Sequence, residues 1–274
     1  MPVDPFGDDK AGTTYWDAVW NTTPPPQPFD PNSTALSDVV EQRFARYFSE
    51  LLRGRYPAGS RLLEIGCARS RWLPYFASEF GYEVVGLDYS ERGAEQAEQV
   101  LAAARVHGTI RVGDLFDPQA DLLESFDIVV SFGVVEHFRD YEGCIRHMAR
   151  FLAPGGMMIT EIPNMGGLVG KITRVLDRRV YDKHVVINRQ ELQTAHEAAR
   201  LAVLRSEYFM WTNWAVINVG SWTNPRLKYW AWWCIDRVTK IFRLFERHVL
   251  QPSANSATSP YIVCAAQKPP GDRH

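Results

Sequence analysis

The hydrophobic positions between residues 61 and 163 form short runs that alternate with segments of helical period. Runs rich in Val, Ile and Leu are typical of buried strands, and apolar residues at every third or fourth position are typical of amphipathic helices. The strand-like runs are RLLEIG, EVVGLD, TIRVGD, FDIVVSFG and GMMITEIP, and the helical segments are Arg71–Phe80, Glu91–Arg105 and Tyr141–Leu152. This alternation predicts a doubly wound α/β fold, with a parallel sheet covered by helices on both faces.

The segments on either side of this region extend the pattern. Residues 1 to about 12 are acidic and are expected to be disordered, and the proline-rich stretch 21–34 predicts an extended arm. The next segment, VVEQRFARYFSELLRG, predicts a helix on the core that ends at Gly54. Farther along, Asn188 and Glu191 have the spacing of a capping box at the start of a helix. Two later strands are expected at 201–211 and 260–269.

The interval between these two last strands predicts an aromatic and basic helical insertion. We divide the chain into an N-terminal arm and helix (1–54), a core (55–211), the insertion (212–258), and a last strand with its tail (259–274). Within the insertion, one apolar stripe has helical spacing: Leu227, Ala231, Cys234, Val238, Ile241, Phe245 and Val249. Such a helix either packs on its own domain, which is the simplest interpretation, or serves as a membrane contact, a homodimer seam or a cap over an apolar substrate, all within residues 225–250.

Composition narrows the class of protein. With 274 residues, of which 46% are hydrophobic, the chain is long enough for one large globular domain. Its net charge of −2 is unevenly distributed: residues 1–161 contain 14 Lys and Arg against 24 Asp and Glu, and the remainder contains 16 against 8. Four widely spaced cysteines suggest neither a disulfide framework nor a zinc site. Without a signal peptide or spanning helix, the sequence predicts a cytoplasmic protein, and no known nucleic-acid module is present.

Small and acidic residues mark the ends of the predicted strands, where ligands bind in such sheets. After the first strand, Gly66 begins a tight turn that leads into a helix, and helix N-termini favour anionic groups. Glu64 can accept a hydrogen bond from an ammonium group, and Asp88 can bind the two hydroxyls of a ribose. Asp114, next to Leu115, can bond the exocyclic amine of a flat base. An amino acid, a ribose and a purine together describe S-adenosylmethionine.

The ordered motifs LLEIGCARS, VVGLDYS, VGDLFD, FDIVVSFGVVEHF and FLAPGGMMITEIPN resemble those of class I S-adenosylmethionine-dependent methyltransferases, in particular the small-molecule branch. The resemblance implies a Rossmann-like sheet of seven strands, mostly parallel, with an antiparallel last strand. It also implies that an N-terminal segment folds over the cofactor as a lid. The cofactor contacts that it implies are Tyr15, Glu64, Gly66, Cys67, Ala68, Asp88, Tyr89, Asp114, Leu115, Phe132 and Gly133.

Two details depart from the family or leave an alternative open. The glycine-rich turn of the family has three glycines, whereas Ala68 and Ser70 stand where the later two would be. Arg69 is unusual in such a turn and points either into solvent or toward the carboxylate of the ligand. Asp114 is either a cofactor contact or the cap of a short helix that follows it.

Methyl transfer from a sulfonium is a direct displacement, so the enzyme mainly aligns the acceptor and excludes water. An oxygen acceptor usually also needs a base, for which His137 and His184 are the candidates; packing or helix capping is the alternative role for His137. No metal is expected. We therefore predict methylation of a small, partly apolar molecule, at an oxygen, with carbon and nitrogen as the alternative reacting atoms. The alternatives are a non-catalytic scaffold with the same fold and, less well supported because GCARSR lacks the GxGxxG pattern, a nicotinamide-dependent oxidoreductase.

Overall fold

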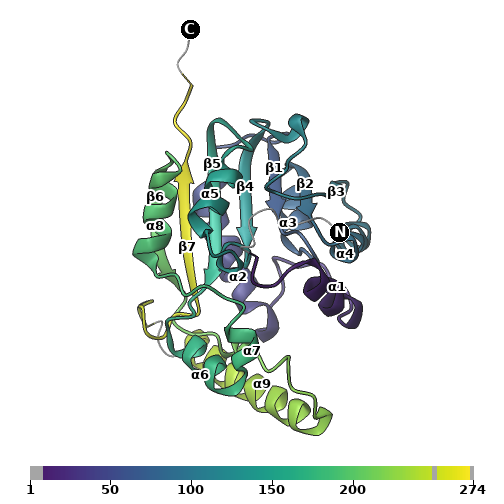
Figure 1. Ribbon diagram of the computed structural model, residues 1–274, viewed down its shortest axis with the longest axis vertical. Helices are drawn as coiled ribbons and strands as arrows, with labels where there is room; N and C mark the ends of the chain where they lie inside the picture. Colours follow the sequence, from purple (N-terminus) through teal and green to yellow (C-terminus); the bar gives the residue numbers. More distant parts are fainter. Residues whose placement is uncertain (1–8, 249–251, 272–274) are drawn as a thin grey trace.

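The computed structural model describes residues 9–248 and 252–271, which fold around a seven-stranded sheet. The strands lie in the order β3-β2-β1-β4-β5-β7-β6, and β7 alone runs antiparallel to its neighbours (Figure 1). Their bounds are β1 Arg61–Ile65, β2 Glu83–Asp88, β3 Thr109–Val112, β4 Phe126–Phe132, β5 Leu152–Pro163, β6 Ala202–Phe209 and β7 Tyr261–Gln267. The predicted fold class and the antiparallel last strand are confirmed.

Helices cover both faces of the sheet because successive strand residues point to opposite sides. In β1, Leu62 belongs to the core beneath α2, α3 and α4, whereas Leu63 belongs to the core beneath α5 and α8. The bounds of these helices are α2 Val39–Leu52, α3 Trp72–Phe80, α4 Glu91–Ala104, α5 Tyr141–Ala149 and α8 Arg189–Ala198. Each strand is therefore buried on both faces, as its continuous run of apolar residues predicts.

Side-chain caps fix where several of these helices begin. Ser90 accepts the backbone N–H of Gly93 at the start of α4, directly after β2. At the start of α8, the side chain of Asn188 accepts backbone N–H groups and the Glu191 side chain accepts the N–H of Asn188. The predicted capping box is therefore confirmed. Such caps satisfy backbone donors that have no partner within the helix.

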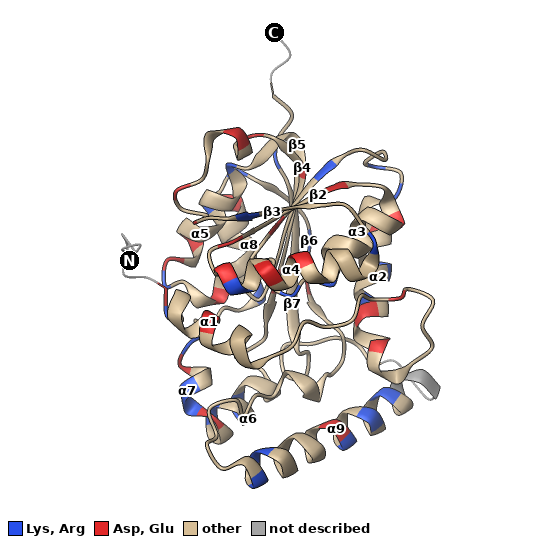
Figure 2. Cartoon of the chain, turned by 90° about the vertical axis from the view of Figure 1, so that its right-hand side faces the viewer, with Lys and Arg blue, Asp and Glu red and all other residues tan. Residues whose placement is uncertain are grey.

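The N-terminal segment lies against the sheet edge where the parallel strands end. Helix α1 (Thr13–Thr22) packs beside α4, and an extended stretch leads from it to the short helix η1 (Leu36–Asp38) (Figures 1 and 2). The expectation of disorder to residue 12 is wrong for residues 9–12, because Asp9 forms a β-bridge with Phe138 and the N–H of Lys10 donates to the carbonyl of His137 at 2.9 Å. Residues 1–8 lie outside the described range.

Beyond the same edge, α6 (Leu168–Leu176), α7 (Arg178–Tyr181) and the long helix α9 (Pro225–His248) form the lower end of the molecule (Figure 1). Helix α9 lies between β6 and β7 in the chain and follows the short helix η4 (Trp214–Val216). It packs on its own domain, as the simplest interpretation holds, but the predicted apolar stripe is not the face that is covered: Leu227, Ile241 and Phe245 are exposed. Val249 lies outside the described residues.

None of the helices within the described ranges combines the length and the apolar composition needed to cross a lipid bilayer.

Candidate functional site

The predicted polar residues meet at one edge of the sheet, at the ends of four neighbouring strands. Glu64 lies near the end of β1, Asp88 ends β2, Asp114 follows β3, and Gly133 follows β4. Strand order reverses at β1, which has β2 on one side and β4 on the other. Such a reversal opens a crevice above the strand ends, so the structure brings these residues together where a doubly wound sheet binds its ligand.

Gly66 allows the chain to turn sharply directly after β1. Its φ angle is +73°, a left-handed conformation, and an added Cβ would collide with the side chain of Val134. The N–H of Gly66 donates to the carbonyl of Leu87 at 2.8 Å. The side chain of Cys67 is fully buried in the core, so the turn presents backbone rather than side-chain atoms to the crevice. Only glycine fits here without strain.

Ser70, which stands where the family has a glycine, holds two parts of the turn together. Its hydroxyl donates to the buried carboxylate of Glu64 at 2.5 Å and accepts the N–H groups of Trp72 and Leu73, both at 3.0 Å. Burial raises the pKa of Glu64 to about 8, although the hydrogen bond from Ser70 opposes that shift. The serine therefore caps the start of α3 and orients the carboxylate that is predicted to bind the ammonium group.

Arg69 points neither into bulk solvent nor at the ligand side of the turn. Its φ angle is +58°, and its guanidinium donates to the carbonyl of Pro24 at 2.9 Å and lies 5.5 Å from the ring centroid of Trp20. Both expected positions for this side chain are thus wrong. The arginine instead attaches the N-terminal arm to the turn.

Asp88 fixes the same turn from the second strand. Its Oδ2 accepts the N–H of Ala68 at 2.8 Å, and its Oδ1 accepts the N–H of Ser90 at 2.9 Å. Each carboxylate oxygen can accept a further hydrogen bond, which leaves capacity for two ribose hydroxyls. Burial raises the pKa of Asp88 to about 6. The neighbouring Tyr89 donates its hydroxyl to Asp9 at 2.9 Å.

The predicted base-binding residues lie beside the crevice. Asp114 is half-exposed and accepts the N–H of Phe116 at 2.9 Å, so its carboxylate closes a turn. It caps no helix, because the next helix along the chain, η2 (Ala120–Leu122), begins six residues later. Leu115 is buried, and the ring of Phe132 packs among aromatic side chains of α2 and α3. Phe132 is only partly buried, and the notion that its backbone meets the cofactor stays a prediction.

Helix α1 closes over the crevice through polar and aromatic contacts. Asp17 accepts a hydrogen bond from the Ser90 hydroxyl at 2.5 Å, directly beside Asp88. The ring of Tyr15 lies 4.0 Å from the ammonium of Lys183, a cation–π contact with the loop after α7. These contacts attach α1 to the core beside Asp88, and a cofactor contact by Tyr15 stays a prediction.

A second contact with this edge, made by Lys10, could not be predicted from the sequence. Its backbone N–H donates to the carbonyl of His137, and its ammonium donates to the carbonyl of His184 at 2.5 Å. The first residues of the chain are acidic and have a composition typical of disordered segments. The two histidines that Lys10 contacts lie more than 120 residues away in the sequence. Only the folded structure reveals that this strap crosses both candidate bases.

His137 and His184 lie side by side with Glu136, in the turn after β4 and the loop after α7. Their ring centroids are 4.8 Å apart. The Nδ1 of His137 faces the carbonyl of Lys183 and the Nδ1 of His184 faces that of Val180, both at 2.9 Å. Because a carbonyl only accepts, each Nδ1 carries the proton and each Nε2 keeps its lone pair. The Nε2 of His137 faces the Glu136 carboxyl at 3.8 Å, beyond hydrogen-bond distance.

Burial determines the charge state of this cluster. It lowers the pKa of His137 to about 3, lowers the pKa of His184, and raises the pKa of Glu136 well above its usual range. At neutral pH both imidazoles are therefore uncharged. One ligand atom from each of the three side chains lies within 4.8 Å of the others, so the cluster has the composition to hold a metal ion as well as to accept protons. The two histidines were predicted from the sequence, whereas no role was predicted for Glu136.

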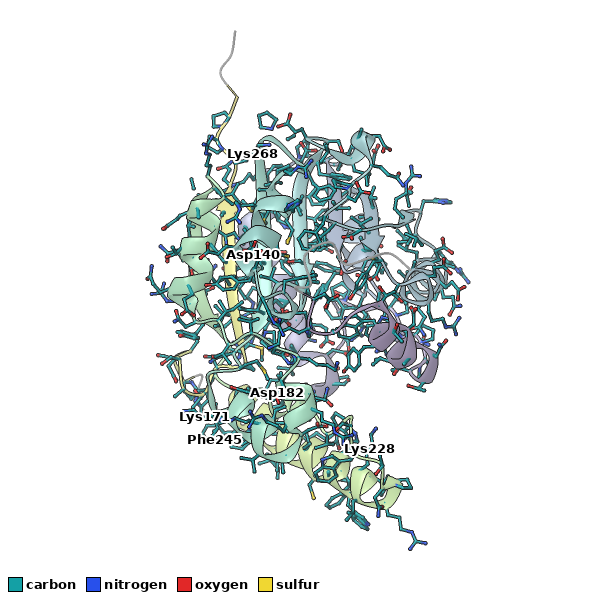
Figure 3. The ribbon with its side chains drawn as sticks, viewed as in Figure 1. Asp140, Lys171, Asp182, Lys228, Phe245 and Lys268 are labelled. Carbon is teal, nitrogen blue, oxygen red and sulfur yellow. The ribbon has the colours of Figure 1, made fainter. Side chains whose placement is uncertain are left out.

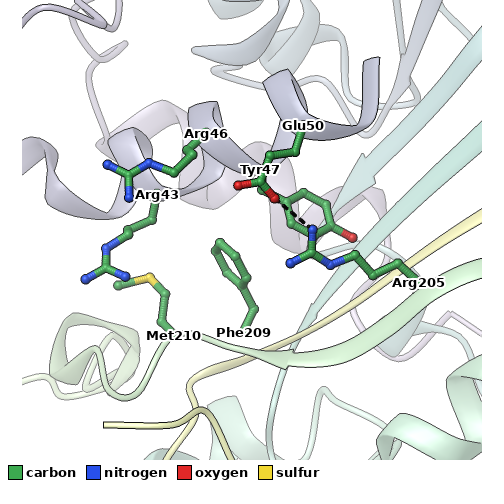
Figure 4. A pocket seen from close by; sticks show the side chains of 7 residues that line it. All are labelled: Arg43, Arg46, Tyr47, Glu50, Arg205, Phe209 and Met210. Carbon is green, nitrogen blue, oxygen red and sulfur yellow. Dashed lines mark hydrogen bonds and ion pairs between the residues drawn. The ribbon is translucent and has the colours of Figure 1, made fainter. Parts of the chain in front are cut away.

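A separate cavity of about 110 Å³ lies between α2 and the end of β6 (Figure 4). It is lined by Arg43, Arg46, Tyr47, Glu50, Arg205, Phe209 and Met210. Arg205 already pairs with Glu50 at 3.0 Å, and none of the residues predicted for the site lines this cavity. Ligand sites are usually several times larger, so it is not a candidate substrate pocket.

A family model described as a methyltransferase domain matches residues 39–206, more than half of the chain. The chain belongs to the class I methyltransferases. The matched segment runs from α2 into β6 and contains the strand-end residues Glu64, Asp88 and Asp114 together with both histidines. The family that the sequence motifs resemble is thus confirmed.

Known proteins resemble this methyltransferase to different extents. It is 29% identical over 181 residues to a ubiquinone biosynthesis O-methyltransferase of Mesorhizobium japonicum, covering 63% of this chain and 72% of that protein. A Caulobacter enzyme of the same name is 34% identical over 134 residues, covering 48% and 52%. The alignments thus span from about half to under three quarters of these relatives. Geranyl diphosphate C-methyltransferase from Streptomyces coelicolor has the same fold, with a TM-score of 0.60 and 17% identity over 98% of this chain and 100% of that one.

Family membership implies S-adenosylmethionine as the methyl donor, and the residues at the strand ends have the chemistry to bind this molecule. The buried carboxylate of Glu64 suits the ammonium group, and Asp88 retains acceptor capacity for the ribose hydroxyls. Glycine at position 66 keeps the turn free of side-chain atoms. Asp114 and Leu115 lie where the resemblance places the adenine contacts. No residue in this set conflicts with the cofactor.

Binding of S-adenosylmethionine at pH 7 is expected to release close to one proton from Glu64. Because burial raises the pKa of this carboxyl to about 8, it is mostly protonated at pH 7 in the free enzyme, and a bound ammonium favours the carboxylate. Titration calorimetry in two buffers of different ionisation enthalpy measures the release, which should vanish at pH 9. Glu64→Gln should bind without proton release. Equal heats for the native enzyme in both buffers at pH 7 would contradict this role.

Proposed function

We propose that this methyltransferase transfers a methyl group to an oxygen atom of a small, partly apolar molecule. The observation that carries the proposal is the pair of uncharged imidazoles at the crevice, each with its Nδ1 bound to a backbone carbonyl and its Nε2 unprotonated. An oxygen acceptor loses a proton when it is methylated, whereas many amine acceptors are nucleophilic without such help. The relatives that are named O-methyltransferases support the same assignment.

The surroundings of the histidines favour an acceptor with an apolar part. The ring of Trp16 meets the ring of His137 edge to face at 5.2 Å, and Tyr15 lies beside Trp16 at 5.1 Å. Val134, which precedes Glu136 in the chain, and Val185, which directly follows His184, are both partly buried against the core. Aromatic and aliphatic side chains around a few polar groups are typical of sites for small organic molecules.

The residues of the chain supply alignment, exclusion of water and a proton acceptor. When bound, S-adenosylmethionine supplies an electrophilic methyl group on a sulfonium. The lid α1 and the Lys10 strap close the crevice, which keeps water from competing as an acceptor. The Nε2 of His137 can take the hydroxyl proton of the acceptor. The lowered pKa of this imidazole does not prevent the step, because a hydroxyl oxygen becomes strongly acidic as it gains the methyl group.

Matched acceptors test the proposal. The purified enzyme is incubated with S-adenosylmethionine and with pairs of aromatic compounds that differ only in carrying a hydroxyl or an amine, and the products are identified by mass spectrometry. We expect methyl ethers from the hydroxylated members and little product from the amines. If only the amines were methylated and no ether formed, the reacting atom would be nitrogen and the proposal for oxygen would be wrong. Tight cofactor binding with no product from any pair would favour the non-catalytic scaffold.

A further inference from the structure

Helix α9 is anchored to the domain along one side only. Thr239 is 4% exposed, and the ring of Phe242 lies 5.6 Å from that of Trp211 and 5.3 Å from that of Trp214. Near the end of its described side chains, Arg243 donates to the carbonyl of Leu36 at 2.9 Å. These contacts fix the rotation of the helix about its axis. They therefore also fix which side chains face away from the protein.

The opposite side presents a continuous apolar stripe to the outside. Its members recur at spacings of three or four residues, and their exposed fractions include 58% for Leu227, 58% for Trp230, 65% for Ile241 and 41% for Phe245. The remaining members are Cys234 and Val238, which are also exposed. A run of exposed apolar side chains along a whole helix marks an interaction surface rather than ordinary solvent-facing chain. We call these six residues the α9 stripe.

Cationic side chains flank the α9 stripe. Residues 225–245 contain four of them apart from the anchoring Arg243, namely Arg226, Lys228, Arg237 and Lys240, against a single acidic residue. That residue, Asp236, pairs with Lys240 at 2.8 Å. Arg237 lies over the exposed ring of Trp233 at 5.2 Å. Figure 2 shows basic positions distributed along the length of α9.

We propose that the α9 stripe lies on an anionic phospholipid surface. Acyl chains would cover the apolar side chains, and lipid phosphates would pair with arginines such as Arg226 and Arg237, while the Trp side chains occupy the interface between the two. Because α9 is amphipathic and anchored along its inner side, it lies in the plane of the surface and does not cross it. The proposal does not depend on the identity of the methyl acceptor.

A lipid surface fits the charges better than a second copy of the chain. A symmetric dimer through the stripe would bring the cations of two α9 helices toward each other, and like charges at close range oppose association. Helix α6 lies at the same end of the molecule in both views (Figures 1 and 2). It adds Leu168 at 40% and Val175 at 84% exposure, and Lys171 lies at this end together with Lys228 and Phe245 (Figure 3). The apolar and basic surface thus continues beyond α9.

Vesicle flotation of the full chain tests the apolar part of the proposal. We expect the native protein to float with vesicles of phosphatidylcholine containing 30% phosphatidylglycerol, and to remain unbound with phosphatidylcholine alone. Trp230→Glu combined with Ile241→Glu should reduce binding at least tenfold. Leu204→Glu changes an exposed leucine on β6, away from the stripe, and should bind like the native protein. Circular dichroism verifies that each variant is folded.

Removal of charge tests the basic part. Each Lys or Arg near an anionic surface strengthens binding about fivefold, so Arg226→Gln with Arg237→Gln should weaken it roughly 30-fold. Arg92→Gln with Arg146→Gln removes the same charge from α4 and α5 and should have little effect. Absence of native binding to anionic vesicles overturns the proposal. Sedimentation that shows a dimer dissociated by Trp230→Glu and Ile241→Glu, without vesicle binding, would assign the stripe to a second copy instead.

Discussion

Gly66→Ala is expected to weaken the binding of S-adenosylmethionine by roughly 100-fold or more, the largest loss of cofactor affinity that a single methyl group can cause here. Gly66 has a φ angle of +73°, which costs a residue with a Cβ about 1–2 kcal/mol. The added methyl would also collide with Val134, which leads from β4 into the turn carrying His137. The turn could relieve that collision only by moving away from its position above the strand ends, where it must meet the ligand.

A second glycine, Gly59, distinguishes the effect of backbone strain from the effect of the collision with Val134. Gly59 has a φ angle of +86° and open space around the position of its missing Cβ, so Gly59→Ala introduces similar backbone strain without contact. We expect both variants to lose stability in thermal unfolding, Gly66→Ala more because of its collision with Val134, but only Gly66→Ala to lose cofactor affinity in calorimetric titration. Native affinity in a folded Gly66→Ala protein would show that the turn does not contact the ligand.

The strand-end residues could be predicted from the sequence because their positions follow from periodicity. A run such as EVVGLD determines where β2 ends, and parallel strands end at a common edge, so Asp88 and Glu64 had to lie together. The pairing of Asp88 with the N–H of Ala68 was not predictable, because it depends on how the turn folds back over β2. The acidic residues at the strand ends therefore revealed where the site lies, but not which hydrogen bonds their carboxylates form.

Contacts between distant segments could not be predicted from local patterns. Nothing near Lys10 indicates that it reaches His137 and His184, and Arg69 in a turn gave no sign that it holds Pro24. Periodicity in α9 correctly grouped the apolar residues on one side of the helix. It could not show whether protein covers that side, since a stripe facing a core and a stripe facing a lipid have the same spacing.

His137→Asn is expected to lower kcat by about 10²- to 10⁴-fold while leaving the affinity for S-adenosylmethionine within threefold. The asparagine amide takes the place of Nδ1 and can still donate a hydrogen bond to the carbonyl of Lys183, which His137 contacts at 2.9 Å, so the loop after α7 should keep its place. It cannot accept the proton of the acceptor. Single-turnover assays at saturating cofactor, alongside calorimetric titration, separate the rate of methyl transfer from binding.

Two comparisons distinguish a base from a residue that only positions the loop. His184→Asn should cost less if His137 is the proton acceptor, and His107→Asn, on an exposed loop, should have no effect. The native enzyme should retain its kcat as the pH falls from 8 to 6, because burial lowers the pKa of His137 to about 3 and the imidazole stays neutral throughout that range. Added imidazole should partly restore a His137→Ala variant, since it replaces the lost acceptor. A loss of rate that imidazole cannot restore, with loosened cofactor binding, would return His137 to a structural role.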